Sequence, residues 1–289
     1  MKRFTKHVLI TGTARSGTSW LAETLAAPYR YRLLFEPEHE TRTPKGRLLC
    51  DRWLQDPAPE APETKYLLAV LQNRVDCDWI AQSSNRKFKM HLWPFLPKKF
   101  IIKCVRGNLM GHYINRRFKV PVVHVIRNPY AVLHSQKRSS FPWLQDLHLF
   151  SEQQELVALI KHTYGLDLTQ ADSYSVTERR TIRWCIENVL PLELWKFQES
   201  ESYHVVRYEA LFSDVQAFLD LCARVQLQPV ANLAERYRKP STKTHKNSAL
   251  LSPKKQNPEE HQLSVQEREA VTKILRIFKT QLYPLEDTH

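Results

Sequence analysis

Short, mostly apolar runs alternate along this chain with longer segments that carry apolar residues at helical spacing. Runs of this length are too short for helices, and several are rich in β-branched residues, so they predict buried strands. We expect strands over 6–11, 31–35, 100–105, 121–126 and 203–208. We expect helices over 17–27, 65–75, 177–197 and 211–226. This alternation predicts one α/β domain over residues 1–289, with a central parallel sheet of four to five strands flanked by helices.

The last helix is the most clearly signalled one. Ser264 followed by Glu267 forms a capping box, and an apolar stripe of helical spacing follows it. In contrast, residues 41–64 are rich in proline and charge, which predicts an extended loop that could lie over a substrate site. Residues 78–98 mix aromatic and basic residues without a clear period, so no element is predicted there.

The turn between the first strand and the first helix, residues 12–19, is the most informative stretch. Gly12 and Gly17 bracket it, in a chain with only 6 glycines. Glycine lets the backbone approach an anion closely, and the free N–H groups at a helix start attract negative charge. We therefore interpret this turn as a phosphate-binding loop; the alternative is an ordinary strand-turn-helix junction.

This loop resembles the P-loop of nucleotide hydrolases, but it departs from that template in one residue. Gly12, Gly17 and Ser19 fit the pattern G-x-x-x-x-G-K-[ST], whereas Thr18 stands at the lysine position and the positive charge is on Arg15. No later predicted strand ends in an aspartate that could hold magnesium. We therefore expect phosphate binding in a P-loop-like fold, and no metal.

Two motifs together resemble those of a known enzyme family. Arg-Ser-Gly-Thr-Ser-Trp, residues 15–20, is similar to the 5′-phosphosulfate loop of sulfotransferases that use 3′-phosphoadenosine 5′-phosphosulfate (PAPS). Residues 122–135, a strand followed by Arg127 and then by Ser135, are similar to their 3′-phosphate motif. The Phe-Glu-Pro stretch at 35–37 is closest to the carbohydrate-sulfotransferase branch.

The resemblance implies a set of donor-binding residues. The 5′ end of PAPS would lie against Arg15, Ser16, Gly17, Thr18 and Ser19. The adenine would stack on Trp20, and the 3′-phosphate would contact Arg127 and Ser135. A late basic loop closes over the nucleotide in this family; here residues 236–246, with Lys239, match it only as a class of loop because Pro240 replaces the family glycine.

The residues expected to carry the chemistry are Arg15, Lys103 and Glu36. Lys103 lies inside an apolar strand, and a buried lysine is costly unless it meets an anion. Arg15 and Lys103 would stabilise charge on the leaving phosphate. The family's catalytic histidine corresponds to Val105 here, so the base must come from elsewhere.

Three candidates for the base follow the second strand: Glu36, Glu38 and His39. Glu36 directly follows the strand and precedes Pro37, so it should be held most rigidly and point at the donor. We expect Glu38 and His39 to be solvated or to contact the acceptor. The prediction for the base is therefore Glu36.

Composition narrows the remaining possibilities. The chain has 289 residues, a formal net charge of +13 and 5 scattered cysteines without a C-x-x-C pair, which predicts reduced thiols rather than disulfides or a zinc site. No run approaches the ~20 apolar residues of a membrane span, and the four apolar residues near the start are too few for a signal peptide. We expect a cytoplasmic protein with no membrane span.

The resemblance implies transfer of a sulfuryl group from PAPS to an acceptor hydroxyl, on a carbohydrate or glycan. A small-molecule or lipid alcohol is the alternative acceptor. Two other functions stay open at this point. A P-loop kinase would need magnesium and a lysine at position 18, and a basic nucleic-acid-binding protein would owe its affinity to charge alone. We see no nucleic-acid motif, and the sequence leaves the oligomeric state open.

Overall fold

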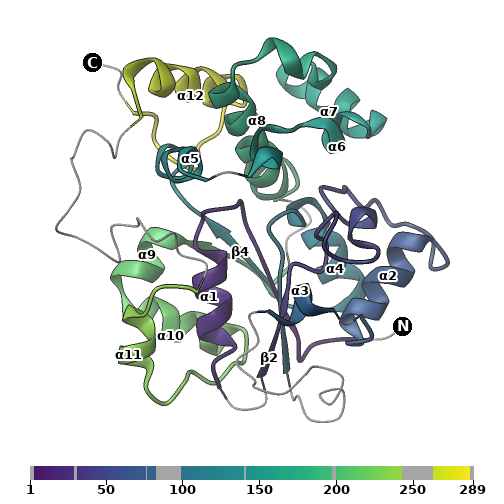
Figure 1. Cartoon of the computed structure of the whole chain (residues 1–289), viewed down its shortest axis with the longest axis vertical. Helices are drawn as coiled ribbons and strands as arrows, with labels where there is room; N and C mark the ends of the chain where they lie inside the picture. Colours follow the sequence, from purple (N-terminus) through teal and green to yellow (C-terminus); the bar gives the residue numbers. More distant parts are fainter. Residues whose placement is uncertain are drawn as a thin grey trace.

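The computed structural model describes residues 3–286 except 29–30, 76, 83–98, 140, 197–199 and 243–262. Its centre is a parallel sheet of five strands in the order β2-β3-β1-β4-β5 (Figure 1). The α/β fold with a parallel sheet flanked by helices is thus confirmed. The strands are β1 (Val8–Thr11), β2 (Tyr31–Phe35), β3 (Lys99–Lys103), β4 (Val122–Ile126) and β5 (Tyr203–Arg207).

The central strands are buried on both faces, which explains their continuous apolar runs. The register pairs Ile10 with Lys103 and Thr11 with His124, so β1, β3 and β4 end side by side. The chain builds the sheet to one side of β1 with β3 and β2, and to the other with β4 and β5. Ligands of open α/β sheets bind at the carboxyl ends where the order reverses, here after β1.

One face of the sheet is covered by helices from both ends of the chain. These are α1 (Thr18–Leu25), α9 (Tyr208–Ser213), α10 (Val215–Arg224) and α11 (Leu233–Arg238). Figure 1 shows α9, α10 and α11 gathered around α1. Leu21 and Leu25 of α1 join Ile10 of β1 and Phe218 of α10 in one apolar cluster. This packing fixes the direction in which α1 leaves the loop at 12–17.

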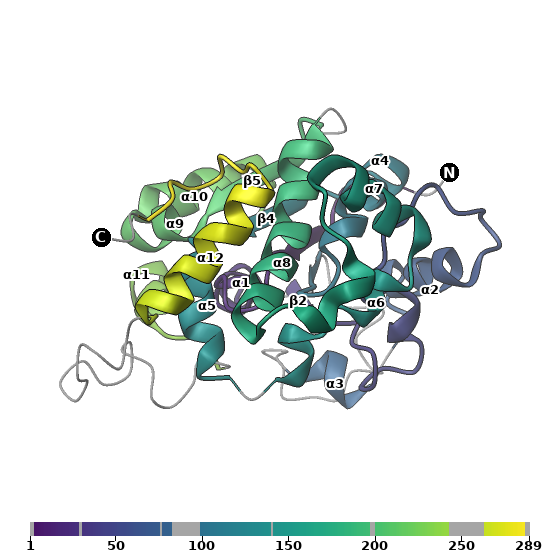
Figure 2. The ribbon, with the colours of Figure 1, turned by 90° about the horizontal axis from the view of Figure 1, so that it is seen from above.

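A larger apolar core lies on the other side of the sheet and continues beyond its carboxyl edge. Near the sheet are α2 (Pro62–Leu71), α3 (Asp78–Ala81) and α4 (Gly111–Phe118). Beyond the carboxyl edge are α5 (Pro129–Lys137), α6 (His148–Ser151), α7 (Gln154–Tyr164), α8 (Val176–Val189) and α12 (Val265–Ile277). Seen from above, α8 and α12 lie side by side next to α5 (Figure 2).

Most predicted elements are present, but three bounds differ for identifiable reasons. The helix expected over 177–197 ends at Val189, and a π-helical turn, Leu190–Leu194, follows it at Pro191. The helix expected over 211–226 is split at Asp214, whose side chain caps α10 by accepting from the Gln216 N–H at 2.8 Å. The helix expected over 65–75 begins earlier, because Pro62 occupies its first turn.

The expected capping box of the last helix is confirmed, with reciprocal bonds between Ser264 and Glu267. Part of the proline-rich segment differs from the loop expected there. A 3-10 turn, Gly46–Leu48, leads into Cys50 and Asp51, which are both buried. The segment around Asp51 therefore belongs to the core.

All five cysteines are free thiols. Among the helices of the described ranges, none has the length and apolar character that crossing a bilayer requires.

Candidate active site

The loop after β1 runs very close to its neighbours, and both of its glycines are required for that. Gly12 has φ +150° and Gly17 has φ +88°, conformations that side chains rarely adopt. A Cβ at Gly12 would overlap the carbonyl oxygen of Val125 on β4, and one at Gly17 would overlap the ring of Tyr208. The loop therefore packs closely against the end of β4 and against Tyr208, the residue that follows β5.

Three carbonyl groups of this loop have hydrogen-bond partners, one within the loop and two outside it. The Thr13 carbonyl accepts from the Ser16 N–H at 3.0 Å, closing the turn. The Ala14 carbonyl accepts from Gln136 Nε2 at 3.1 Å, and the Arg15 carbonyl accepts from Arg127 Nη1 at 2.9 Å. Since N–H and C=O point in opposite directions along a peptide unit, the outward bond of the Ala14 carbonyl favours an Arg15 N–H that faces the loop's interior, as in anion-binding nests. The Ser16 N–H is occupied by the Thr13 carbonyl.

The start of α1 completes this cradle. Its N-cap is Gly17, and no side chain caps its first turn, which begins at Thr18. The first N–H groups of a helix have no intrahelical partner and carry the positive end of the helix dipole. Thr18 is buried and Ser19 is partly exposed, and contact of Ser16 to Ser19 with the 5′ end of a nucleotide stays a prediction. Ser16 Oγ is buried and has no hydrogen-bond partner among the described residues.

The two sequence motifs meet at this loop. Arg15 Nε donates to Ser135 Oγ at 3.1 Å, although 120 residues separate them, and Arg127 bonds to the Arg15 carbonyl. The end of α5, with Arg138, is also near Arg15. Burial, followed by the charges of Arg127 and Arg138, lowers the pKa of Arg15. Such a gathering of guanidinium groups is stabilised by a bound anion.

The motif around Arg127 has the local structure that its sequence predicts. Asn128 caps α5 by accepting from the N–H groups of Tyr130 and Ala131, and Pro129 occupies the first turn. Arg127 thus ends β4, and Ser135 lies about two turns along α5 (3.6 residues per turn) on the face toward Arg15. Glu209 accepts from the Asn128 N–H at 2.9 Å and from the Tyr283 hydroxyl at 2.8 Å, so it links the start of α5 to the segment after α12.

Tyr208 is a site residue that the sequence analysis missed. Its ring lies against Gly17, and the Arg127 guanidinium carbon is 4.6 Å from the ring centroid. On its far side the ring stacks on Phe212 at 5.6 Å, and Phe212 is 45% exposed. The sequence signal was the strand end at 203–208, where the first residue after a parallel strand reaches the ligand edge.

Trp20, predicted to stack on adenine, is largely enclosed. Its indole is 8% exposed and meets the rings of Tyr208, Phe218 and Tyr237 edge to face. Its Nε1 donates to the Tyr237 carbonyl at 3.3 Å. Trp20 therefore packs against α11, which contains Tyr237, and stacking of adenine on it stays a prediction.

Part of the predicted basic loop is docked on α1. The buried Glu23 carboxylate accepts from the Ser241 hydroxyl at 3.1 Å and from the Thr242 hydroxyl at 2.6 Å. Lys239 is exposed on this docked segment, near the helix that carries the phosphate loop. Its contact with the nucleotide stays a prediction, and residues 243–246 of the loop lie outside the described residues.

Lys103 and Glu36 form an ion pair at the ends of β3 and β2. Lys103 is 2% exposed, and its ammonium group is 4.4 Å from the centroid of the Phe35 ring. Glu36 has φ +44°, an unusual value for a non-glycine residue, and its N–H donates to the Lys103 carbonyl at 2.8 Å. A strained backbone that is held in place in this way is typical of functional positions.

The expectation that Glu38 is solvated is wrong. Its side chain is buried, and Oε1 accepts from the N–H groups of Val105 and Arg106 at 2.8 and 3.1 Å. Burial, and next the charge of Glu36, raises the pKa of Glu38, while the bond from Arg106 opposes this. Glu38 therefore holds the turn after β3, because that turn has backbone donors that need a buried acceptor.

His39 lies beside this turn, with its ring 4.5 Å from that of Trp79. The His39 Nδ1 accepts from the N–H groups of Thr41 and Arg42, each at 3.3 Å. A neutral ring that accepts at Nδ1 carries its proton on Nε2 and has no second lone pair to act as a base. Burial lowers the pKa of His39, which favours this neutral form.

An apolar wall adjoins the loop on the side of β3. Ala14 of the loop, Val105 and Leu144 are buried together, with Trp143 packed against them. Phe141 stacks on Trp143 with centroids 6.3 Å apart and is 49% exposed. Val105, at the place where the family resemblance implies a histidine, is thus part of a small buried apolar cluster.

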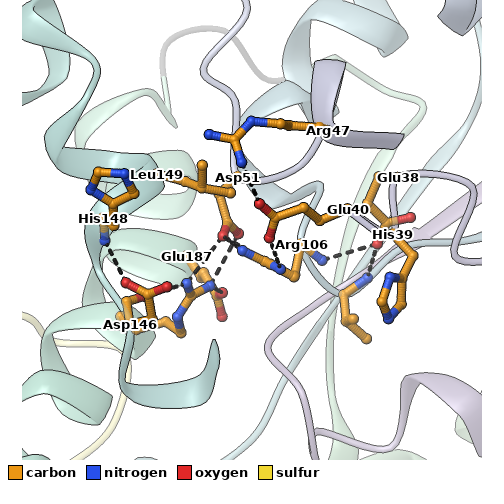
Figure 3. A network of polar contacts seen from close by, with 12 residues as sticks. Glu38, His39, Glu40, Arg47, Asp51, Arg106, Asp146, His148, Leu149 and Glu187 are labelled. Carbon is orange, nitrogen blue, oxygen red and sulfur yellow. Dashed lines mark hydrogen bonds and ion pairs between the residues drawn. The ribbon is translucent and has the colours of Figure 1, made fainter. Parts of the chain in front are cut away.

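A buried charge network supports the turn after β3 from behind. Asp51 accepts from Arg106 Nε at 2.9 Å and from both terminal nitrogens of Arg183 at 3.0 Å (Figure 3). Arg183 also pairs with Glu187 at 2.9 Å, and Arg106 with Glu40 at 3.3 Å. Burial raises the pKa of Glu187 to about 7, against the nearby charge of Arg183.

Metal-ligating side chains do not gather in the described ranges, where no group of three or more His, Cys, Asp or Glu could hold an ion.

The comparisons with known proteins give matches only among solved structures. No family model and no curated protein matches the chain. A sulfotransferase domain from the curacin biosynthetic pathway is 18% identical, with coverage of 97% of this chain and 93% of that domain and a TM-score of 0.43. A sulfotransferase domain from the Synechococcus PCC 7002 olefin synthase is 16% identical, with 98% of each chain covered and a TM-score of 0.44.

Retinol dehydratase in complex with androsterone and the inactive cofactor PAP is 14% identical, with 98% of this chain and 84% of that chain covered and a TM-score of 0.39. These matches span nearly the whole chain. Likeness of this degree assigns neither a reaction nor an acceptor to the chain.

Proposed function

We propose that this protein transfers a sulfuryl group from PAPS to an acceptor hydroxyl. The observation that carries the proposal is the convergence of the two motifs: Arg15 of the loop bonds to Ser135, and Arg127 bonds to the Arg15 carbonyl. One anion site is thus built from residues that are far apart in the chain. A strand-turn-helix junction with accidental glycines would not explain this convergence.

The residues at this edge fit a nucleotide with a phosphate at each end. The N–H groups of the loop and of the first turn of α1 would hold the 5′ end, with the unpartnered Ser16 hydroxyl as a further donor. Arg127 and Ser135 would hold the 3′-phosphate. Arg15 belongs to the loop and bonds to Ser135, so it would link the residues at the 5′ end with those at the 3′-phosphate. The aromatic ring of Tyr208 lies next to Arg127. PAPS supplies an activated sulfuryl group when it is bound.

In this proposal, Glu36 and Lys103 act on the reacting atoms. As the acceptor oxygen gains the sulfuryl group, adenosine 3′,5′-bisphosphate (PAP) leaves and the hydroxyl proton must be taken up. In this proposal the Glu36 carboxylate takes that proton. Lys103, which pairs with Glu36, would stabilise negative charge on the leaving phosphate together with Arg15.

For the acceptor, we favour an alcohol of a small molecule or lipid over the carbohydrate that the sequence suggests. The side of the loop toward β3 is lined by Ala14, Val105, Leu144 and Trp143, and the exposed Phe141 extends this surface. Apolar side chains cannot replace the water around many sugar hydroxyl groups, which makes binding of a glycan there costly.

Thermal unfolding with three ligands tests the donor. A ligand of the native state raises the unfolding temperature, so PAP should do so more than ATP with magnesium or duplex DNA. A larger effect of ATP with magnesium would instead favour a P-loop kinase, and stabilisation by DNA alone a nucleic-acid-binding protein. Transfer of labelled sulfate from PAPS to a panel of glycans, lipids and phenols then identifies the acceptor.

A further inference from the structure

The helix α8 reaches under the phosphate loop with a fully buried asparagine. Asn188 Nδ2 donates to Thr13 Oγ1 at 2.7 Å and to the Trp184 carbonyl at 2.7 Å. Asn188 Oδ1 lies 3.2 Å from His124 Nε2. The Trp184 carbonyl can only accept, so it fixes which end of the amide faces the loop. Nδ2 therefore points at Thr13 and Oδ1 at His124.

The donor and acceptor roles of the next two groups in this series of hydrogen bonds, His124 and Tyr203, are fixed as well. Because Asn188 Oδ1 can only accept, the His124 ring must donate from Nε2. Burial lowers the pKa of His124 to about 4, so the ring is neutral and its Nδ1 is an acceptor for the Tyr203 hydroxyl at 3.1 Å. The hydrogen bonds thus run in one direction, from Tyr203 through His124 and Asn188 to Thr13.

This series of hydrogen bonds reaches Thr13, the residue that closes the phosphate loop, and continues from the Thr13 hydroxyl to Glu187. The Thr13 carbonyl accepts from the Ser16 N–H, and Thr13 follows Gly12, which has no side chain to hold it in place. The other loop anchors, Gln136 and Arg127, bond to the carbonyls of Ala14 and Arg15. Two neighbouring side chains of α8 therefore hold the Thr13 hydroxyl: Asn188, which donates to it, and Glu187, whose carboxylate accepts from it.

We propose that Asn188 is a positioning residue of the donor site. By donating to Thr13 it holds the loop in the conformation that presents its N–H groups to the 5′ end of the nucleotide. This inference rests on the proposed function, because PAP is the ligand that reports it. Asn188 lies under the loop, in the core, and contacts neither the donor nor the acceptor in this proposal.

A matched pair of variants tests this role against a merely structural one. Asn115 is also a buried asparagine, and its Nδ2 donates to the Val120 carbonyl and to Ser202 Oγ, each at 2.9 Å, away from the loop. Both Asn188→Ala and Asn115→Ala should lower the free energy of unfolding in urea. Only Asn188→Ala should weaken PAP binding in calorimetry, by roughly five- to tenfold for one lost hydrogen bond that orders the loop.

A double-mutant cycle with Thr13→Val identifies the path of the effect. If Asn188 acts through Thr13, the losses of PAP affinity in Asn188→Ala and Thr13→Val will not add in the double variant, whereas Thr13→Ser will retain the affinity. Should Asn188→Ala not fold, the comparison of Thr13→Val with Thr13→Ser carries the test. Wild-type affinity in Asn188→Ala or Thr13→Val, or an equal loss in Asn115→Ala, would overturn the inference. Wild-type protein that binds no PAP would instead overturn the proposed function itself.

Discussion

The ammonium group of Lys103 contacts the carboxylate of Glu36 across two adjacent parallel strands. The register pairs Phe35 with Lys103, so Glu36 lies one residue beyond the position opposite Lys103. Its side chain points back toward the Lys103 ammonium group. Its N–H bond to the Lys103 carbonyl fixes this turn. The ion pair therefore fixes the positions of the proposed base, Glu36, and of the proposed charge-stabilising cation, Lys103. A bound donor and acceptor would have to interact with both members of this ion pair.

The role of Glu36 as the base predicts a specific kinetic result. Glu36→Gln keeps the shape of the side chain and removes its basicity, so kcat should fall by roughly 10²–10⁴. The affinity for PAP, measured by calorimetry, should stay that of the wild type, because Glu36 lies outside the group that holds the phosphates. Turnover within a few-fold of wild type would show that Glu36 is not the base.

His39 serves as the comparison for that experiment. Its Nδ1 accepts from two backbone N–H groups, which leaves its proton on Nε2. His39→Ala should therefore keep turnover near that of the wild type. If His39→Ala had no measurable turnover while Glu36→Gln stayed active, His39 would be identified as the base.

Arg127 should distinguish nucleotides with and without a 3′-phosphate. Arg127→Ala should weaken binding of PAP by roughly ten- to a hundredfold, the value of a charge-assisted hydrogen bond. Binding of adenosine 5′-phosphosulfate should weaken less, because that nucleotide has no 3′-phosphate and senses only the lost bond to the Arg15 carbonyl. Arg116→Ala, which removes an exposed guanidinium that pairs with Asp56 at 2.7 Å, controls for the loss of net charge. Equal losses for both nucleotides would show that Arg127 does not read the 3′-phosphate.

Alanine substitutions at two glycines with similar φ angles distinguish the effect of backbone strain from the effect of a steric clash at the site. Gly17 has φ +88° and faces the Tyr208 ring, whereas Gly165 has φ +69° and open space around it. Alanine at either position should cost about 1–2 kcal/mol of stability from the left-handed conformation. Only Gly17→Ala should also lose PAP binding in calorimetry, because its methyl group must displace Tyr208. Equal PAP affinity in both variants would show that this close approach does not matter for the site.

Stability should depend on pH through His124. The ring is fully buried and its pKa is lowered to about 4, mainly by burial. The unfolded chain, with a histidine pKa near 6.5, binds the proton more tightly, so this contribution is complete above pH 6.5 and is lost as the pH falls toward 4. Its full size is about 3 kcal/mol. In urea unfolding between pH 4 and 7, His124→Asn should show a smaller slope than wild type; an equal slope contradicts the assignment.

The carboxyl of Glu187 contributes with the opposite sign. Its pKa is raised to about 7 by burial, so the folded state binds the proton more tightly and stability falls as the pH rises from about 4.5 to 7. Glu187→Gln should therefore increase the slope of stability with pH, whereas His124→Asn decreases it. The same urea series checks both, and slopes that change in the same direction would show that one of the two assignments is wrong.

The strands and the phosphate loop could be predicted from sequence because their signals are local. An apolar run such as 122–126 favours a buried strand by itself, and Gly12 and Gly17 mark a turn that only glycine can make. Helix ends are predicted less well, because one residue can decide them. Pro191 lies in the π-helical turn that follows α8, and the Asp214 side chain caps α10 through one hydrogen bond.

The surroundings of the site could not be predicted because they depend on contacts between distant segments. Glu38 looks solvated beside Glu36 and Glu40, yet it is buried by bonds to a turn that lies 67 residues later. The bond from Asn188 to Thr13 spans 175 residues, and no local pattern around Asn188 indicates it. Tyr208 stood in the predicted strand, but only the sheet order brings it beside Gly17.

The charge network around Asp51 has a consequence for how the molecule opens. Asp51, Arg106 and Arg183 come from three separate parts of the chain, and releasing any one of them leaves the others buried and uncompensated. These segments should therefore open together rather than one by one. Their amide protons should exchange with solvent only in the slowest class, with the free energy of global unfolding, while the exposed ends of the chain exchange much earlier.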